Sequence, residues 1–273
     1  MSGRWKIYIL IIPAFVFILT FFVIPLSITV GRSFYDKDEG ITAVNYLDFF
    51  RERVSRNAFI RSLKIGGIVT LISIVLSYPT AMAINGMKSG KKTIVMTLIV
   101  LPLMTNPVAR TFAWLAVIGR EGMINNLLVA MGMRRVKILY TEPAVLLGLL
   151  QLFMPLMILS LVSSFENLNE DYILAARSLG ASRLQTFFKV QLPLTSEGLV
   201  IGGMLVFAGS ISAYVTPALL GGSRILMLST LLYQRASVLL DWNMATAIAV
   251  IMLMLTILIN ILLRYVGNLG RSK

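Results

Sequence analysis

Six long stretches of the chain contain no charged residue and consist mainly of Leu, Ile, Val, Met, Phe and small residues. They cover residues 7–31, 65–87, 93–109 (extendable through Arg110 to 119), 143–165, 198–223 and 242–263. A helix that crosses a membrane needs about 20 predominantly apolar residues. A membrane-spanning barrel would instead show alternating strands of about ten residues. The pattern therefore predicts an all-α membrane protein with six transmembrane helices, in a single domain over residues 1–273.

The composition supports a membrane protein and excludes several kinds of chemistry. Hydrophobic residues make up 57% of the chain and charged residues only 14%, whereas a soluble domain carries about 25% charged residues. The chain has neither cysteine nor histidine, which excludes thiolate chemistry, zinc sites built on these residues and histidine acid–base catalysis. We expect no catalytic residues, no metal site and no enzyme, because no nucleophile–base pair stands out. The net charge of +13 favours contact with anionic lipids over nucleic acid.

Charge counting leaves the orientation of the six helices open. With six spans, equal numbers of Lys and Arg residues fall on the two sides of the membrane. Two local features favour a cytoplasmic N-terminus: Arg4 and Lys6 precede the first run, and Lys88, Lys91 and Lys92 crowd the short turn after the second. The first run is longer than the apolar core of about 7–15 residues in a signal peptide, so we expect a retained helix.

The segment between the fourth and fifth runs, residues 166–197, carries the signals of a short helix. Asn169 is a suitable N-cap, and acidic residues follow it in the first turn, where the helix dipole favours negative charge. Gly180 can end the helix in the left-handed conformation. Ser182 can then cap a second amphipathic helix, which we expect Pro193 to end. These residues fit either a surface that another protein contacts closely or an interfacial helix that only seals the bundle.

The few polar and aromatic groups in the spans define a candidate pathway. Arg110 is the only charge in the extended third run, and Trp114 follows one turn later. The pair fits an arginine that extends to the interface beside an aromatic anchor, or a charge at the mouth of a pathway. Aromatic rings can bind a cation, and prolines can break spans beside a path. The candidate pathway residues are Tyr78, Arg110, Trp114, Phe153, Tyr214, Pro217 and Asp241.

The loop resembles the EAA loop of ABC-transporter permeases. The matching residues are Ala175-Ala176, Gly180 and Val190-Gln191-Leu192-Pro193, at the spacing of that family, although Leu174 stands where the family usually has glutamate. Further segments resemble permeases of the spermidine/putrescine import class. These segments are residues 101–106, 110–114, 122–125, 139–141, 216–222 and 241–242.

The resemblance implies a type I ABC importer permease fold, in which the loop 166–197 forms a coupling helix that docks on a cytoplasmic ATPase. The residues that it implies in ATPase coupling are Glu170, Asp171, Ala175, Ala176, Arg177, Gly180, Ala181 and Pro193. The implied partners are a second permease subunit (a paralogue more often than an identical copy), two ATPase subunits, an extracytoplasmic solute-binding protein and membrane lipids. ATP and magnesium would bind to the ATPase, with no cofactor in this chain.

The expected function is that of a permease subunit in an ATP-driven importer in the bacterial cytoplasmic membrane, with both termini in the cytoplasm. The resemblance favours a polyamine, spermidine or putrescine, as the solute. Residues 86–93 lack the G-x-x-x-x-G-K-[ST] spacing of a phosphate loop, so ATP hydrolysis belongs to a partner. The alternatives are an ion-coupled secondary carrier, whose usual buried acids and histidines the spans lack, and the same kind of importer with another solute.

Overall fold

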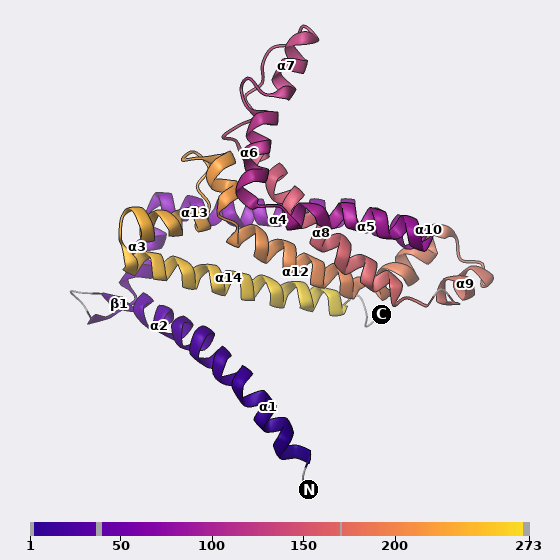
Figure 1. Cartoon of the computed structure of the whole chain (residues 1–273), viewed down its shortest axis with the longest axis horizontal. Helices are drawn as coiled ribbons and strands as arrows, with labels where there is room; N and C mark the ends of the chain where they lie inside the picture. Colours follow the sequence, from indigo (N-terminus) through magenta and orange to yellow (C-terminus); the bar gives the residue numbers. More distant parts are fainter. Residues whose placement is uncertain (1–2, 37–39, 170, 270–273) are drawn as a thin grey trace. The chain divides into compact units, whose positions relative to one another are not determined.

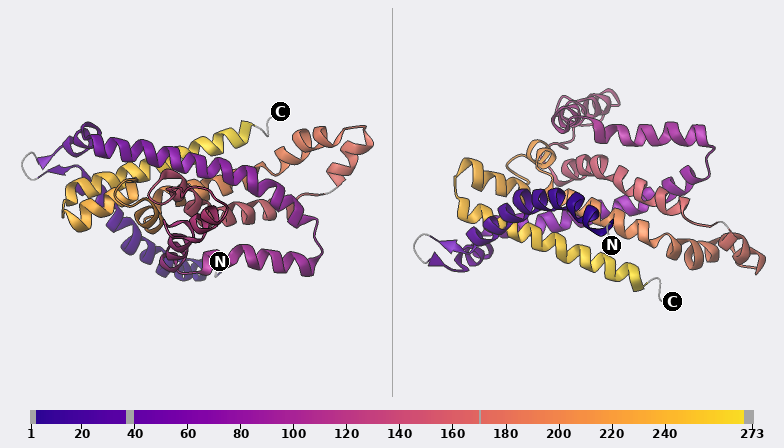
Figure 2. Two further views of the ribbon diagram at one scale, coloured as in Figure 1. Left: turned by 90° about the horizontal axis from the view of Figure 1, so that it is seen from above. Right: turned by 60° about the horizontal axis from the view of Figure 1, so that its bottom comes forward.

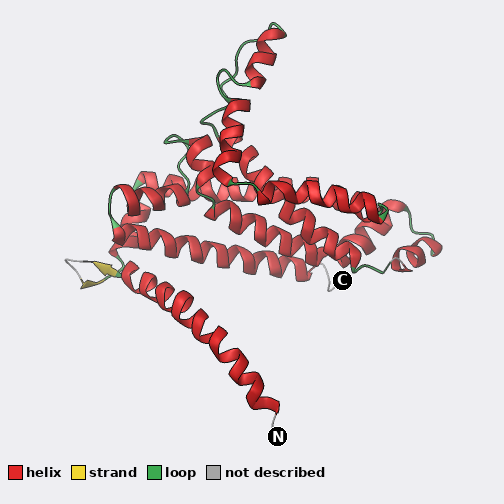
Figure 3. Ribbon diagram, in the orientation of Figure 1, coloured by secondary structure: helices red, strands yellow, loops and turns green. Residues whose placement is uncertain are grey.

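The computed structural model describes residues 3–36, 40–169 and 171–269, and nearly all of these lie in helices (Figures 1 and 3). The elements, with η for a single π-helical turn, are α1 (Gly3–Ile18), η1 (Leu19–Val23), α2 (Ile24–Ser33), β1 (Tyr35–Asp36), β2 (Gly40–Ile41), α3 (Val44–Arg51), α4 (Arg53–Asn85), α5 (Ser89–Met104), α6 (Pro107–Ile118), α7 (Met123–Ala130), α8 (Glu142–Glu166), α9 (Asp171–Ser178), α10 (Arg183–Thr186), η2 (Phe187–Gln191), α11 (Leu192–Leu194), α12 (Ser196–Ser212), η3 (Pro217–Gly221), α13 (Leu228–Tyr233), η4 (Gln234–Val238) and α14 (Trp242–Leu269). The two strands pair antiparallel as a small hairpin.

Each of the six apolar runs overlaps one candidate span. Four helices are long and apolar enough to cross a membrane: Ile11–Ser33, Arg53–Asn85, Glu142–Glu166 and Trp242–Gly267. Two bent pairs qualify when each is counted as one span: Ser89–Met104 with Pro107–Ala130, and Arg183–Leu194 with Ser196–Ser212. The described residues therefore hold between four and six spans, all built from helices.

The third run does not continue as one helix through Arg110, as the sequence had suggested. α5 and α6 are separate helices whose axes differ by 97°. The residue before a proline avoids the helical conformation, and Asn106, which precedes a proline, has a ψ of 126°. The Asn106 side chain then accepts hydrogen bonds from the backbone N–H groups of Val108 (2.8 Å) and Ala109 (3.3 Å). This N-cap begins a new helix in a new direction.

The fifth run also ends early as a helix. α12 stops at Ser212, because Ala213 has an extended backbone with a ψ of 125°. The chain then forms the π-helical turn η3, which starts with Pro217, and Gly222 follows it with a φ of +55°. The predicted span over 198–223 is therefore a helix followed by an irregular segment.

The chain divides into two compact units, which we describe separately. Unit 1 consists of Met1–Asn57 and Leu231–Met254. In it, the long apolar helix Ile11–Ser33 has none of its most apolar window buried. Arg235 forms ion pairs with Glu52 and with Asp241, the latter at 3.3 Å.

Unit 2 consists of Ala58–Thr230 and Leu255–Lys273 and contains the largest group of buried apolar residues. Its centre is the antiparallel pair α8 and α12, which lie side by side in both views of Figure 2. Small residues allow this close approach: a Cβ at Gly198 would lie 2.5 Å from Ser164 Oγ and 2.8 Å from the Ser160 carbonyl oxygen. Ser160 Oγ also donates a hydrogen bond of 2.9 Å to the Gly198 carbonyl.

Candidate functional site

The short helix α9 begins and ends with the residues that the sequence indicated. The Asn169 side chain accepts a hydrogen bond of 2.9 Å from the backbone N–H of Asp171. At the other end, Gly180 has a φ of +86° and donates its N–H to the Arg177 carbonyl (3.0 Å), while Ala181 donates to the Ala176 carbonyl (3.1 Å). These two bonds form a Schellman motif. Both ends of α9 are therefore closed by local interactions.

α9 exposes apolar side chains beside its charged ends. None of the residues of α9 is buried, and Tyr172 and Leu174 are 58% and 59% exposed. Leu179, directly after the helix, is 89% exposed. Ala175, one turn after Tyr172, is exposed as well. An exposed apolar group on a capped helix is typical of a contact surface for another protein.

The remaining residues predicted for this segment fall as follows. Asp171 lies in the first turn of α9 and Arg177 in the last, so both charges complement the helix dipole. Glu170 lies outside the described residues. The second helix, which Pro193 was predicted to end, ends one residue later, at Leu194. The helix runs from Arg183 to Leu194 and bends by 62° into α12 around Thr195. Because a proline in the last turn removes only one backbone donor, the π-helical turn η2 before it can absorb the change.

The second helix begins with the predicted cap. Ser182 Oγ accepts a hydrogen bond from the Gln185 N–H (3.3 Å), and the Gln185 side chain accepts one from the Ser182 N–H (2.9 Å). This is a capping box. The helix is thus fixed at its start independently of the rest of the bundle.

An aromatic cluster joins this loop to the spans, and we call it the Tyr78 joint: Tyr78, Phe165, Phe187 and Thr195. Tyr78, in α4, is only 6% exposed. Its ring meets those of Phe165 at the end of α8 and Phe187 in η2 edge to face, each at a centroid distance of 5.4 Å. Its hydroxyl lies 2.9 Å from Thr195 Oγ1. Since the single hydrogen of Thr195 is used on the Gln191 carbonyl (2.8 Å), Tyr78 is the donor.

The joint changes the interpretation of Tyr78. The sequence suggested that this ring lines the pathway, but the structure places it in packed contact with three elements of unit 2. Its position at the bend before α12 makes it a positioning residue for the loop. The contact with Thr195 could not be predicted from the sequence, because the two residues are 117 positions apart in the chain.

Arg110 stabilises the break between α5 and α6. It is 8% exposed, and its Nη1 donates to the carbonyl of Pro102, in the last turn of α5. A cation is favourable at a helix C-terminus, where carbonyl groups lack helical partners. The guanidinium of Arg110 is therefore bound within the break. Its Nη2 is buried and has no hydrogen-bond partner among the described residues.

Trp114 is held at the same break by a residue that the sequence analysis missed. Its Nε1–H donates to Oε1 of Gln151, which lies in the interior of α8, the span Glu142–Glu166. α6 therefore packs beside the span and not beyond its end. The available signal was a single amide in an otherwise apolar run, and such groups in membranes usually have partners.

The other predicted pathway residues do not form one cluster. Phe153 is half-buried in unit 2, with its ring in the space that a Cβ on Gly209 would fill. Tyr214 follows the end of α12, and Pro217 is buried at the start of η3. Asp241 lies in unit 1, where it accepts a hydrogen bond of 3.1 Å from the Met244 N–H and pairs with Arg235. A structural role at the start of α14 explains these contacts.

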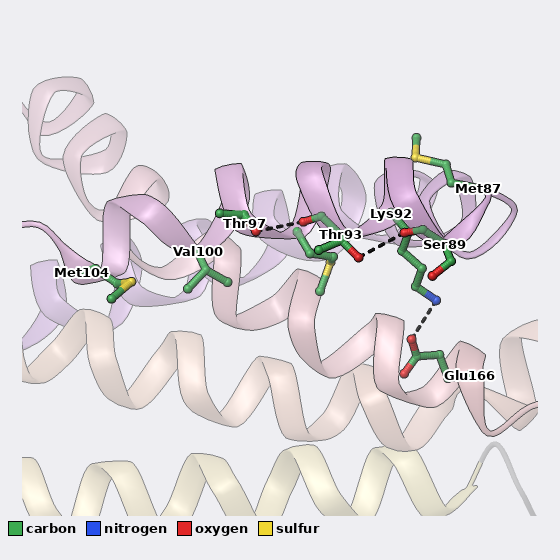
Figure 4. Close-up of a pocket in the computed structure, with 9 residues that line it drawn as sticks. Met87, Ser89, Lys92, Thr93, Thr97, Val100, Met104 and Glu166 are labelled. Atoms are coloured by element: carbon green, nitrogen blue, oxygen red, sulfur yellow. Dashed lines mark hydrogen bonds and ion pairs between the residues drawn. The ribbon is translucent and has the colours of Figure 1, made fainter.

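A groove of about 840 Å³ lies along α5 at the α9 end of unit 2 (Figure 4). One face of α5 lines it, with Thr93, Thr97 and Val100 in successive turns. Lys92 Nζ lies 2.7 Å from Glu166 Oε1, so the start of α5 is tied to the end of α8. The ion pair places the short turn between α4 and α5 at the same end of unit 2 as α9.

The chain matches known proteins over nearly its whole length. The profile of the family described as binding-protein-dependent transport system inner membrane component matches residues 4–269. The chain belongs to this family. The spermidine/putrescine transport system permease protein PotB of Haemophilus influenzae is 31% identical to it over 244 residues, which cover 86% of this chain and 85% of that protein. PotB of Escherichia coli is 28% identical over 240 residues, covering 85% and 87%.

A solved structure supports the fold. The bacterial alginate ABC transporter, in complex with an alginate pentasaccharide-bound periplasmic protein, contains a chain with a TM-score of 0.81 at 17% identity. The match covers 98% of this chain and 96% of that chain. The type I ABC importer permease fold is therefore confirmed. The expected function as a permease subunit of a binding-protein-dependent ABC importer, in an inner membrane, is confirmed as well.

Replacing Gly180 tests the cap of α9 in this permease. Gly180→Val places a branched side chain at a φ of +86°, which costs about 1–2 kcal/mol. We expect hydrogen exchange of the last turn of α9, followed by mass spectrometry, to accelerate about tenfold, since 1.4 kcal/mol is a factor of ten. Solute uptake should fall with it.

Gly132→Val is the matched control, because Gly132 also has a positive φ of +75° and open space around it, outside the loop. It should leave exchange in α9 and uptake unchanged. Normal uptake by a well-expressed Gly180→Val protein would show that the cap is dispensable.

Replacing Tyr78 tests the joint. Tyr78→Phe keeps the ring contacts and removes the hydrogen bond to Thr195. We expect uptake by the complete importer to fall about fivefold while the protein level and basal ATP hydrolysis persist, because a coupling free energy of about 1 kcal/mol has this effect. Thr195→Ser, which keeps the hydroxyl, should retain uptake. Tyr265→Phe, at a tyrosine 64% exposed on α14, is the control. Equal uptake by Tyr78→Phe and wild type would refute the role.

Proposed function

We propose that this chain forms half of the translocation pathway of an ATP-driven polyamine importer and takes its energy from a cytoplasmic ATPase that docks on α9. A second permease subunit, a paralogue, completes the pathway. Two ATPase subunits bind ATP and magnesium, and an extracytoplasmic binding protein delivers the solute. The observation that carries the proposal is α9 itself: a helix capped at both ends, with Leu174 and, directly after it, Leu179 uncovered.

The α9 end of unit 2 is the cytoplasmic end in this proposal. The ion pair between Lys92 and Glu166 supports it, because it groups Lys88, the N-cap of α5, and Lys91 and Lys92, in the first turn of α5, with α9. Lysines in short loops favour the cytoplasmic side. With six spans, α9 follows the fourth, so both termini lie on the same side as α9.

The energy reaches the spans through the Tyr78 joint. Closure of the ATPase dimer on ATP displaces α9. The helix Arg183–Leu194 moves with it, because both helices belong to the loop 166–197. The joint ties this helix to α4 and to the end of α8. A displacement of α9 therefore changes the angle at Thr195, and the permease alternates between inward-open and outward-open arrangements.

The solute proposed is a small linear polyamine. Support comes from the PotB relatives of two organisms, which are 31% and 28% identical and cover most of the chain. The alginate transporter shares the fold at 17% identity. A similarity in fold at this level of identity does not indicate which solute is transported.

Mass spectrometry of the proteins that co-purify with the tagged chain from native membranes in mild detergent tests the assembly. We expect an ATPase, a second permease and a binding protein, and we expect a polyamine among the small molecules released from that binding protein. Recovery of the chain alone, also after cross-linking, would refute the proposal.

A matched pair of variants assigns the ATPase contact. Leu179→Asp, at a residue 89% exposed after α9, should lose the ATPase and keep the second permease. Met131→Asp, at a residue 67% exposed after α7, should keep both. Loss of the ATPase from neither variant, or from both, would contradict docking at α9.

A further inference from the structure

A second groove runs along α8 and α12 up to α9. Its volume is about 780 Å³, within the range of about 300–1,000 Å³ that is usual for small-molecule sites. One face of α8 supplies Ser163 and Asn167, one face of α12 supplies Glu197 and Ile201, and Tyr172 of α9 closes the end. The walls combine aliphatic side chains with hydroxyl, amide and carboxyl groups.

The charge of this groove differs from that of its neighbours. Its lining holds one carboxyl group, Glu197, and neither lysine nor arginine. Each of the other four described grooves includes at least one of these cations in its lining. The difference is notable in a chain with 25 lysines and arginines against 12 acids. Of the five grooves, this is the one whose lining contains no cation that would repel a positively charged ligand.

We infer that this groove binds the ammonium group and adjoining methylene chain of the cationic solute at the α9 end of the permease. The inference rests on the proposed function. A carboxylate and hydroxyl oxygens accept hydrogen bonds from an ammonium group, and an aromatic face such as that of Tyr172 attracts it further. The aliphatic residues, among them Ile201, suit the methylene chain. The site supplies the carboxyl group that the apolar runs themselves lack.

Glu197 borders two grooves. It lies in the first turn of α12, where the helix dipole favours an acid. It also borders a separate groove of about 380 Å³ that includes Arg264. Since the same carboxyl group borders both grooves, the test must measure occupancy of the larger groove itself.

The groove also contacts the segment that moves during transport. Asn169, which caps α9, and Tyr172, on its first turn, both line it. An occupant therefore touches the helix proposed to dock on the ATPase. A ligand that binds better to one position of α9 than to another shifts the equilibrium between the two positions. Binding of solute in the groove therefore changes the contact between α9 and the ATPase.

Cysteine labelling tests occupancy without relying on transport. The chain has no cysteine, so Ser163→Cys introduces a single thiol on its exposed face in the groove. The experiment measures the rate of maleimide labelling in the nucleotide-free complete importer, with and without spermidine. We expect spermidine to slow labelling about tenfold and Glu197→Gln to weaken this protection about tenfold in spermidine concentration, as expected for one lost charge-assisted hydrogen bond.

Controls separate the groove from general effects. Ser212→Cys, at the exposed far end of α12, should label at a rate that spermidine does not change. Glu121→Gln, at an exposed acid before α7, should leave the protection of Ser163→Cys intact. Glu197→Asp keeps the carboxyl group and should keep most of the protection. If Glu197 had only a structural role, protection by spermidine would not depend on its charge.

The outcomes distinguish this inference from the proposed function. If wild type takes up spermidine and Ser163→Cys is not protected, or does not label at all because another subunit covers it, the groove is not the site. If Glu197→Gln leaves protection unchanged, the carboxyl group is not the ligand. If wild type takes up no polyamine, the proposed solute is wrong, and protection by spermidine must then be absent too. Should Glu197→Gln fail to assemble, Ser163→Leu, which fills the groove without changing its charge, should reduce spermidine uptake while Ser212→Leu does not.

Discussion

The close contact between α8 and α12 is the constraint on which the α9 end of unit 2 depends. Gly198 lies against Ser160 and Ser164, so only two small serine side chains lie between the helices at that level. In lipid, where apolar surface gains little from burial against apolar neighbours, small residues and interhelical hydrogen bonds provide the packing. Because the loop 166–197 joins these two helices, their spacing determines where α9 is presented and how wide the adjoining groove is.

The loop is fixed locally at its caps and non-locally at one joint. Asn169, Gly180 and the Ser182 capping box shape the two short helices without help from the bundle. The Tyr78 joint then ties the second helix to the spans through ring contacts and one hydrogen bond. This combination suits a coupling element, because a segment with its own shape can move as a unit, and a single packed contact transmits that movement.

The features that the sequence predicted are those that local chemistry determines. The apolar runs, the Asn169 cap, the left-handed Gly180 and the Ser182 cap each follow from neighbouring residues. The 97° break after α5 required weighing Asn106 and Pro107 against an otherwise continuous apolar run. Three contacts join residues on different elements: Arg110 with Pro102 across that break, Trp114 with Gln151 on α8, and Tyr78 with Thr195 before α12. Their contacts depend on helix packing, which the linear pattern does not encode.

The same distinction explains why the pathway was harder to predict than the coupling segment. Arg110 was a candidate because a charge in a span is rare, yet its contact with the Pro102 carbonyl makes it part of the break.

The central claim is that α9 contacts the ATPase. Site-specific photo-cross-linking from Leu174, 59% exposed on α9, in the complete importer tests it most directly, with Met254 on α14, 63% exposed, as reference. We predict a cross-link to the ATPase from Leu174 and none from Met254. Absence of that cross-link from Leu174, in an importer that retains its ATPase, would contradict it.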